Sequence, residues 1–152
     1  MKRRTLEALV EEIAALRRDE KTIVLANGVF DLLHVGHLRY LEAARAHGDY
    51  LVVAVNSDAS TRAYKGPTRP VIPEDERAEL IGGFSCVDRV VVFDEPNVGR
   101  VITTLKPDIH AKGTDYTPDT VPERAMVLAY GGRVVVCGDP KDHSSTALIG
   151  KK

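Results

Sequence analysis

The hydrophobic positions of this chain follow two patterns that alternate along its length. Short apolar runs rich in β-branched residues, which are typical of strands, occur at 22–26, 51–55, 90–93, 109–111 and 134–137. The stretches between them carry apolar residues at helical spacing. The run from Leu51 to Val55 is continuous and not alternating, as expected of a parallel strand covered on both faces. Strands that alternate with helices predict an α/β fold, with an open parallel sheet of about five strands and helices on both faces.

Local signals mark where several of these helices begin and end. Pro73 precedes three acidic residues, which the helix dipole favours in a first turn, and Gly82-Gly83 ends that run. We expect Asn97 to cap the helix that runs through Leu105. Thr120 and Glu123 have capping-box spacing and predict the start of a further helix.

The first twenty residues have the pattern of an amphipathic helix. Leu6, Val10, Ile13 and Leu16 recur at helical spacing, with charged residues between them. Such an apolar stripe needs a cover. The cover comes either from the rest of the domain or from a second copy of the chain in a homodimer, and the pattern leaves both open.

Length and composition narrow the class of protein. A chain of 152 residues predicts a single domain over residues 1–152. Its 21 Lys and Arg against 22 Asp and Glu give a net charge of −1, without the basic surplus of a nucleic-acid partner. The apolar run from Tyr50 to Val55 is far below the ~20 residues of a membrane span. Glu7, Glu11 and Glu12 interrupt any signal peptide, so we expect a cytoplasmic protein without membrane contact.

The two cysteines give no framework for a disulfide or a metal. Cys86 and Cys137 lack CxxC spacing, and we expect both to be buried free thiols.

The richest segment for chemistry lies where the first strand gives way to its helix, at residues 26–37. In open α/β sheets, ligands bind beyond the carboxyl ends of strands, and a helix N-terminus attracts anions. Gly28 lets a phosphate or a backbone approach closely, and Gly36 separates His34 from His37, which lie one helical turn apart. Both imidazoles can therefore face the same anion. The segment lacks the GxGxxG of a dinucleotide site.

The two histidines have two other interpretations besides anion binding. A pair at i, i+3 suits zinc, but a zinc site needs a third or fourth ligand and none is obvious. An isolated HxxH favours structural histidines. Within NGxFDxxHxGH after a predicted strand, anion binding is favoured instead.

This segment resembles the HxGH signature of the nucleotidylyltransferase superfamily, and motifs farther along the chain sharpen the resemblance. They look like those of bacterial D-glycero-β-D-manno-heptose 1-phosphate adenylyltransferases, occur in the same order, and span about residues 22–149; they begin at Val55, Lys65, Val87, Lys106, Lys112 and Ser144. Two motifs depart from that family. Thr114 stands where Gly is usual in Gly-Gly-Asp-Tyr, and Ser145 where Thr is usual in Ser-Thr-Thr.

The resemblance implies a Rossmann-like nucleotidylyltransferase fold and an enzyme that transfers AMP from ATP to a heptose 1-phosphate, giving ADP-heptose and pyrophosphate for lipopolysaccharide or another surface glycan. His34, His37 and Lys65 would be catalytic. Mg²⁺ would be bound mainly by the ATP phosphates and not by a dedicated protein metal site. The implied nucleotide-binding residues are Asn27, Gly28, Phe30, Gly36, Lys112, Gly113, Asp115, Ser144, Ser145 and Thr146, and the implied sugar-phosphate-binding residues are Asn56, Asp58 and Arg69.

Alternatives remain for the function of the protein and for the roles of single residues. The protein could instead be a cytidylyltransferase for glycerol 3-phosphate or ethanolamine phosphate, or a non-catalytic nucleotide-binding module. Locally, Asp31 serves equally well as a turn anchor, Asp58 as a helix cap and Lys112 as a solvated lysine. Arg77 suits either a sugar phosphate or a surface ion pair.

Overall fold

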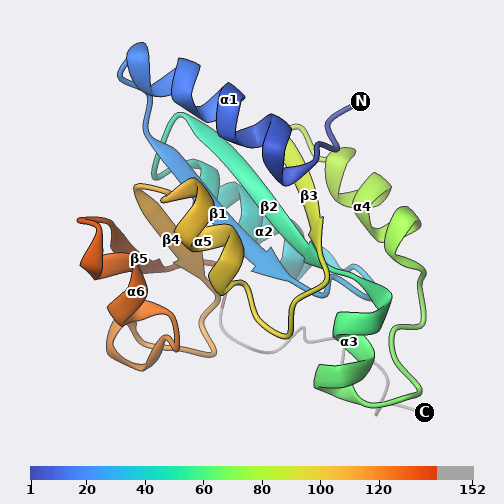
Figure 1. The fold of residues 1–152 in the computed structure, drawn as a ribbon. Helices are drawn as coiled ribbons and strands as arrows, with labels where there is room; N and C mark the ends of the chain where they lie inside the picture. The colour runs from blue at the N-terminus through green and yellow to red at the C-terminus, as the bar shows by residue number, and fades with distance from the viewer. Residues whose placement is uncertain (140–152) are drawn as a thin grey trace.

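The computed structural model describes residues 1–139, which build a parallel sheet flanked by helices (Figure 1). The sheet has five strands in the order β3-β2-β1-β4-β5, so the predicted α/β architecture is confirmed. The strands are β1 (Ile23–Gly28), β2 (Tyr50–Asn56), β3 (Arg89–Phe93), β4 (Ile109–Lys112) and β5 (Arg133–Val136).

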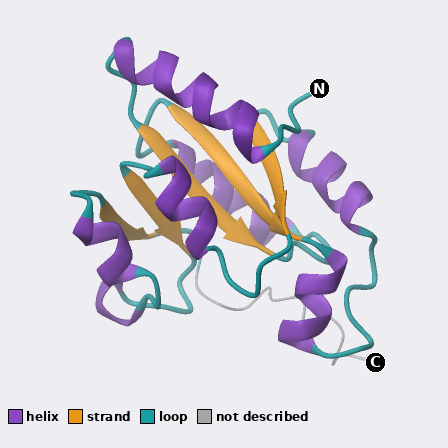
Figure 2. Cartoon of the chain, in the orientation of Figure 1, coloured by secondary structure: helices purple, strands orange, loops and turns teal. Residues whose placement is uncertain are grey.

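Helices cover both faces of this sheet (Figure 2). Apolar residues of α2 and α4 pack on one face, and those of α1, α5 and α6 pack on the other. The short α3 lies beyond the carboxyl end of β2 (Figure 1). The helices are α1 (Leu6–Arg18), α2 (Val35–Arg45), α3 (Asp58–Lys65), α4 (Glu74–Gly82), α5 (Gly99–Leu105) and α6 (Arg124–Ala129), with a 3₁₀ turn, η1, at Pro118–Thr120.

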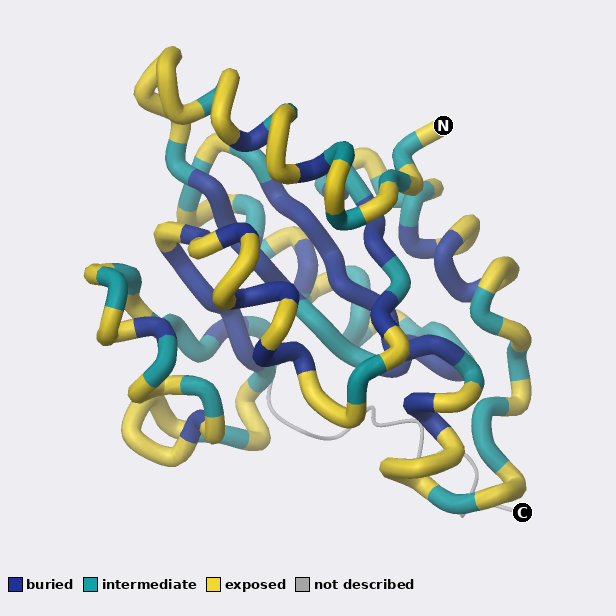
Figure 3. The backbone as a smooth tube through the Cα atoms, in the orientation of Figure 1, coloured by how far each residue is buried: buried dark blue, intermediate teal, exposed yellow. Residues whose placement is uncertain are grey.

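Alternate residues of the central strands feed two separate hydrophobic cores. In β1, Val24 and Ala26 face α2 and α4, whereas Ile23 and Leu25 face α1 and α5. All four are almost completely buried, and Figure 3 shows the central strands β1 and β2 as mostly buried. A strand buried on both faces needs apolar residues at every position, which explains the continuous runs in the sequence.

Helix α1 is covered by its own domain. Leu9 and Ile13 are buried against the sheet and α5, while Val10 is 43% exposed, so the predicted stripe was wrong at this position. Positions 6, 9, 13 and 16 follow the 3.6-residue period as well as the predicted positions 6, 10, 13 and 16 do. Only packing against the sheet decides which of the two sets is buried. The stripe therefore gives no reason to expect a second copy at this helix.

Residues before α1 cover the outer edge of the sheet. The backbone N–H of Val90 in β3 donates to Lys2 O at 3.1 Å, and the N–H of Arg4 donates to Val90 O at 2.8 Å. A parallel bridge between Arg3 and Val90 results, on the strand that ends the sheet on this side.

The helix caps differ from those predicted from the sequence. Asn97 Oδ1 accepts the backbone N–H of Gly99 at 2.9 Å at the predicted start of α5, but the N-cap position is held by Val98 and carries no side-chain cap. The capping box predicted for Thr120 and Glu123 is wrong, because Thr120 forms that motif with Thr117 on η1. Glu123 instead occupies the N-cap position of α6 without a side-chain cap. No helix within residues 1–139 has the length and apolarity to cross a membrane.

Candidate active site

A cavity of about 720 Å³ opens beyond the carboxyl ends of the strands. Its centre is β1, which pairs with β2 on one side and with β4 on the other. This is the point where strand order reverses and where open α/β sheets bind ligands. Most residues singled out in the sequence line this one cavity; they are Asn27, Gly28, Phe30, His34, Gly36, His37, Asn56, Lys65, Arg69, Lys112, Gly113 and Asp115.

The turn from β1 into α2 has an uncommon backbone shape. Phe30 and Leu32 have φ values of 55° and 48°, in the left-handed region that non-glycine residues seldom adopt. The Phe30 ring then lies over Gly28, where a Cβ atom would stand 3.2 Å from the ring. The missing side chain of Gly28 thus makes room for an aromatic ring, whereas the sequence suggested a phosphate or a backbone. The ring also contacts His37 edge-on, with centroids 5.7 Å apart.

The two histidines cap α2 with their inner ring nitrogens. His34 Nδ1 accepts the backbone N–H of Gly36 at 3.1 Å, and His37 Nδ1 accepts the backbone N–H of His34 at 3.1 Å. An imidazole nitrogen that accepts a hydrogen bond carries no proton, so a neutral ring must hold its proton on Nε2. The capping box therefore fixes the tautomer of both rings, whose centroids lie 4.1 Å apart. Each ring is left with an Nε2–H donor.

The surroundings keep His37 neutral near pH 7. Burial is the main cause that lowers the pKa of His37 to about 4, and the positive charges of His34 and Lys65 add to it. A neutral imidazole with its proton on Nε2 is a hydrogen-bond donor without a net charge. It can bind a phosphate oxygen without first gaining a proton.

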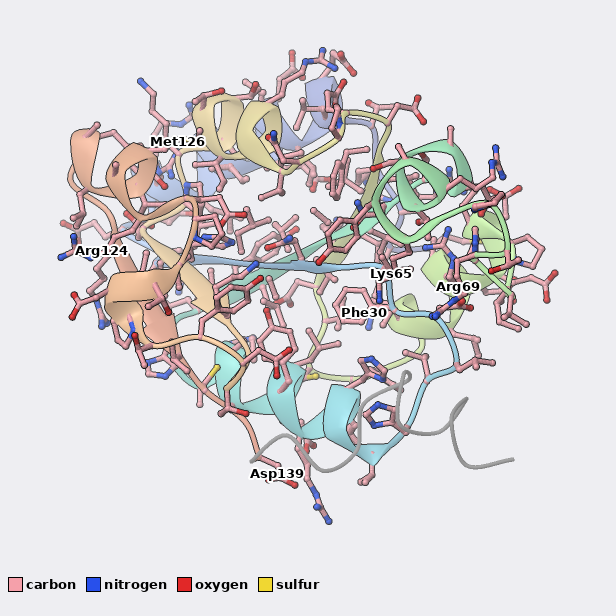
Figure 4. The ribbon with its side chains drawn as sticks, turned by 90° about the horizontal axis from the view of Figure 1, so that it is seen from below. Phe30, Lys65, Arg69, Arg124, Met126 and Asp139 are labelled. Atoms are coloured by element: carbon pink, nitrogen blue, oxygen red, sulfur yellow. The ribbon has the colours of Figure 1, made fainter. Side chains whose placement is uncertain are left out.

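A second group of side chains approaches from α3 and the loop after it. Lys65 is the last residue of α3, and Arg69 follows in the loop, both on the same flank as Phe30 (Figure 4). Asp31 fastens this loop, since its carboxylate accepts the backbone N–H groups of Val71 at 2.7 Å and Ile72 at 2.9 Å. It also accepts Arg69 Nε at 3.1 Å. Asp31 thus anchors the loop to the β1–α2 turn, which confirms the interpretation of this residue as an anchor.

The electrostatics of this group favour a negatively charged ligand. Burial opposes ionisation of Asp31, but the N–H groups of Val71 and Ile72 and the Arg69 guanidinium outweigh it and hold its pKa below the usual value. Burial lowers the pKa of Lys65, and the Arg69 charge lowers it further, against the opposing pull of Asp31 and Asp115. A phosphate placed beside Lys65 would reverse these effects and favour the ammonium form.

Arg77 is completely buried behind the cavity, which corrects the expected surface ion pair or phosphate ligand. Its Nη1 donates to Val29 O at 2.6 Å, just beyond the carboxyl end of β1, and to Asn56 O at 2.7 Å, at the carboxyl end of β2. Its Nη2 donates to Asp58 Oδ1 at 2.9 Å. Asp58 is absent from the residues that line the cavity, and the side-chain cap of α3 comes from Ser57 instead. The structure therefore brings neither Asp58 nor Arg77 to the ligand space.

The far wall of the cavity is formed after β4. Lys112 is buried, which excludes the solvated-lysine interpretation; its Nζ lies 3.9 Å from Glu123 Oε1 and 4.9 Å from the centre of the Tyr116 ring. Burial lowers the pKa of Lys112, while Glu123 and Asp115 oppose that shift. Sequence reasoning missed Glu123 as a wall residue because it treated this glutamate as a cap. It also missed Tyr116, although Tyr116 stands in the same motif as Lys112.

Other residues of the sequence analysis have different positions. Asn56 lines the cavity, and its amide donates to Ser60 Oγ at 2.9 Å. Cys137 is a buried free thiol on the cavity wall, whereas Cys86 is half-buried, so only one of the two matches the expectation. Three predicted nucleotide-binding residues lie outside the described residues; they are Ser144, Ser145 and Thr146.

Together these groups form a site for a large anion with an uncharged end. His34 and His37 at the start of α2 line the cavity and would offer Nε2–H donors to phosphate oxygens, with Lys65 and Arg69 in the same lining as cations. Across residues 1–139 no three or more His, Cys, Asp or Glu side chains gather in a way that could hold a metal ion.

Comparisons with known proteins identify the family of the chain. The cytidylyltransferase-like family model matches residues 25–150. The chain is 51% identical over 146 residues to the bifunctional protein HldE of Syntrophotalea carbinolica, covering 96% of this chain and 30% of that relative. For the HldE protein of Pseudomonas fluorescens the identity is 44%, with 97% and 31% covered. The chain thus spans about a third of the length of these curated relatives.

A solved structure supports the same assignment. The crystal structure of the lipopolysaccharide core biosynthesis protein from Thermoplasma volcanium matches with a TM-score of 0.69 and 32% identity, over 80% of this chain and 99% of that one. The fold and the sequence therefore both match known proteins over most of the chain. The chain belongs to the cytidylyltransferase-like family.

Proposed function

We propose that this protein is an adenylyltransferase that transfers AMP from ATP to D-glycero-β-D-manno-heptose 1-phosphate. A phosphate oxygen of the sugar 1-phosphate attacks the α-phosphorus of ATP, and the bond from that phosphorus to the β-phosphate oxygen breaks. The products are ADP-heptose and pyrophosphate. ATP as the donor places the reaction in the cytoplasm.

The observation that carries this proposal is the fixed tautomer of the paired histidines. The attacking phosphate is already an anion and needs no general base, so catalysis consists of holding two anions together and stabilising the charge of the transition state. The Nε2–H donors of His34 and His37 suit that task, because their inner nitrogens are engaged by the backbone. Donors fixed before the reaction lose little energy in reorganising during it.

Lys65 and Arg69 supply the positive charge between the two substrates. Asp31 binds their loop to the same turn that carries the histidines, so the cations and the donors belong to one connected unit. The long flexible stem of Lys65 suits a group that follows the phosphoryl charge as it develops. Asn56, at the carboxyl end of β2, is placed to meet sugar hydroxyls.

The nucleoside would lie toward β4, away from Lys65 and Arg69. Glu123 there is unfavourable for phosphates but accepts hydrogen bonds from hydroxyl or amino groups. Lys112, Gly113 and Asp115 border the same part of the cavity. Mg²⁺ would be held mainly by the triphosphate and would neutralise part of its charge.

Two observations support a heptose 1-phosphate as the sugar substrate. The motif order resembles heptose 1-phosphate adenylyltransferases, and the solved relative is described as a lipopolysaccharide core biosynthesis protein. The description of the family itself favours a second candidate, a cytidylyltransferase for glycerol 3-phosphate or ethanolamine phosphate.

The test is pyrophosphate release by the purified protein with Mg²⁺, each nucleoside triphosphate and each phosphorylated acceptor. We expect turnover with ATP and the heptose 1-phosphate, and ADP-heptose in the product mixture. Turnover with CTP alone would replace the proposal by the second candidate. Nucleotide binding without turnover on any acceptor would instead indicate a non-catalytic module.

A further inference from the structure

His110 does not line the cavity, but it contacts the side-chain amide of Asn27, which does. His110 lies in β4 and is completely buried, and its Nε2 is 2.9 Å from Oδ1 of Asn27, which lines the cavity. The two side chains share a face of the sheet. Ile109 and Ala111 on either side of His110 belong to the core under α2 and α4, so His110 points to the opposite face, as Leu25 and Asn27 do in β1.

The proton on His110 follows from its surroundings. Its Nδ1 is buried and has no hydrogen-bond partner within residues 1–139. A buried N–H without an acceptor is rarer in proteins than an acceptor without a donor. The ring therefore carries its proton on Nε2 and donates to Asn27 Oδ1. Burial, together with the charge of Lys112, lowers the pKa of His110 to about 3, so the ring stays neutral.

The orientation of the Asn27 amide is the consequence that matters for the site. Once Oδ1 accepts from His110, the NH₂ group must turn the other way, toward the cavity. Asn27 stands near the end of β1, one residue before Gly28. The neighbouring strand β4, which ends at Lys112, pairs with β1 beside it. A ligand there meets two fixed donors instead of an amide that could present either its oxygen or its nitrogen.

We propose that His110 is a positioning residue, which acts through Asn27 to present an amide donor to an acceptor atom of the bound nucleotide. This inference rests on the proposed function only in that the ligand is a nucleoside triphosphate. His110 itself does not touch the ligand.

The test compares two substitutions that differ in one hydrogen bond. His110→Gln places an amide NH₂ near the former Nε2, while His110→Leu fills similar space without a donor. We expect His110→Leu to weaken ATP binding by about tenfold in a calorimetric titration, the size of one lost hydrogen bond, and His110→Gln to stay within about twofold of wild type. In an Asn27→Ala background, His110→Leu should cause no further loss.

Titration of His110→Leu with adenosine shows which part of the nucleotide carries the acceptor atom. An unchanged adenosine affinity assigns the acceptor to the phosphates, and a loss that matches the loss for ATP assigns it to the nucleoside.

Several results would overturn the role of His110. They are an unchanged affinity in His110→Leu, a tenfold loss in the Asn27→Ala background, or no rescue by His110→Gln. A measurement on the wild type decides even where variants fold poorly. Nitrogen-15 shifts of His110 should show a protonated Nε2 and a bare Nδ1 from pH 5 to 8, and a protonated Nδ1 would contradict the assignment. If CTP proves to be the donor, the same titrations with CTP still decide the matter, so failure of the proposed function is distinguishable.

Discussion

His37 accepts the backbone N–H of His34 at 3.1 Å, so the second histidine of the motif caps the helix on which both stand. Each ring thereby has a structural nitrogen and a chemical nitrogen. A substitution can remove one role and keep the other, which allows the two to be measured separately.

The His37→Asn variant should separate these roles. The amide Oδ1 of Asn can replace Nδ1 as the acceptor, but the side chain does not reach the position of Nε2. We expect the melting temperature to stay near the wild-type value and kcat to fall about 100- to 1000-fold, as for the loss of one transition-state donor. His37→Ala should show the same loss of kcat together with the loss of a cap, about 1 kcal/mol. Unchanged turnover in His37→Asn would remove His37 from the mechanism.

Lys65→Met should lower kcat with little effect on folding. Lys65 ends α3 at the cavity, and its removal takes a cation from the place where we expect transition-state charge. The expected loss is at least about 100-fold in kcat/KM, with partial recovery in Lys65→Arg. Arg62→Met is the matched control, because Arg62 lies on the same helix and is exposed like Lys65, but is not part of the cavity lining. Equal effects of the two substitutions in a steady-state assay would argue for bulk charge and against a placed group.

Arg77→Met should destabilise the fold severely. The substitution leaves the buried carbonyls of Val29 and Asn56 without their donor and the Asp58 carboxylate without its partner. Each buried carbonyl left without a donor costs about 1–3 kcal/mol, and the loss of the ion pair adds less because the Asp58 side chain is 31% exposed. For a domain of this size that corresponds to a drop of about 10 °C in the melting temperature. Arg3→Met breaks the exposed pair with Asp75 and should change the melting temperature by no more than about 2 °C. A small effect of Arg77→Met in a thermal melt would contradict the network.

Stability should fall as the pH falls below about 6.5, in part because of His110. Its pKa is about 3 in the folded state, below the value of 6.5 for a free histidine. Between these two values the unfolded chain binds a proton that the folded chain does not, so acidification favours unfolding. This one group contributes up to about 1.4 kcal/mol per pH unit to the slope. Urea unfolding from pH 7 to pH 5 should therefore show a shallower slope in His110→Gln than in the wild type.

The control for this pH dependence is His47→Gln. His47 is exposed just after α2, and its substitution should leave the wild-type slope unchanged. A His110→Gln variant with the wild-type slope would show that the buried histidine does not set it.

The sequence was a good guide wherever local pattern and burial coincide. Strand β2 could be predicted because a strand covered on both faces must be apolar throughout. The histidine pair was singled out because two histidines around a glycine, directly after a predicted strand, have few structural uses, whereas Lys65 entered only through the family resemblance. The switch point followed from the alternation of strands and helices.

Other features depend on partners that are distant along the chain. Leu9 and Val10 have similar apolarity, and only contact with the sheet shows which one is buried. Arg77 looks like any helix-surface arginine until the ends of β1 and β2 meet around it. The link from His110 to Asn27 joins residues 83 positions apart, so no local pattern could reveal it.

The bridge between Arg3 and Val90 has a bearing on how this protein behaves at high concentration. An uncovered border strand offers its free amide and carbonyl groups to any neighbouring molecule, and β3 with its three consecutive valines would be an attractive template for such stacking. The leading residues occupy that template themselves. Trimming them for crystallisation or recombinant work would invite self-association through backbone pairing, even though the catalytic end of the molecule would be untouched.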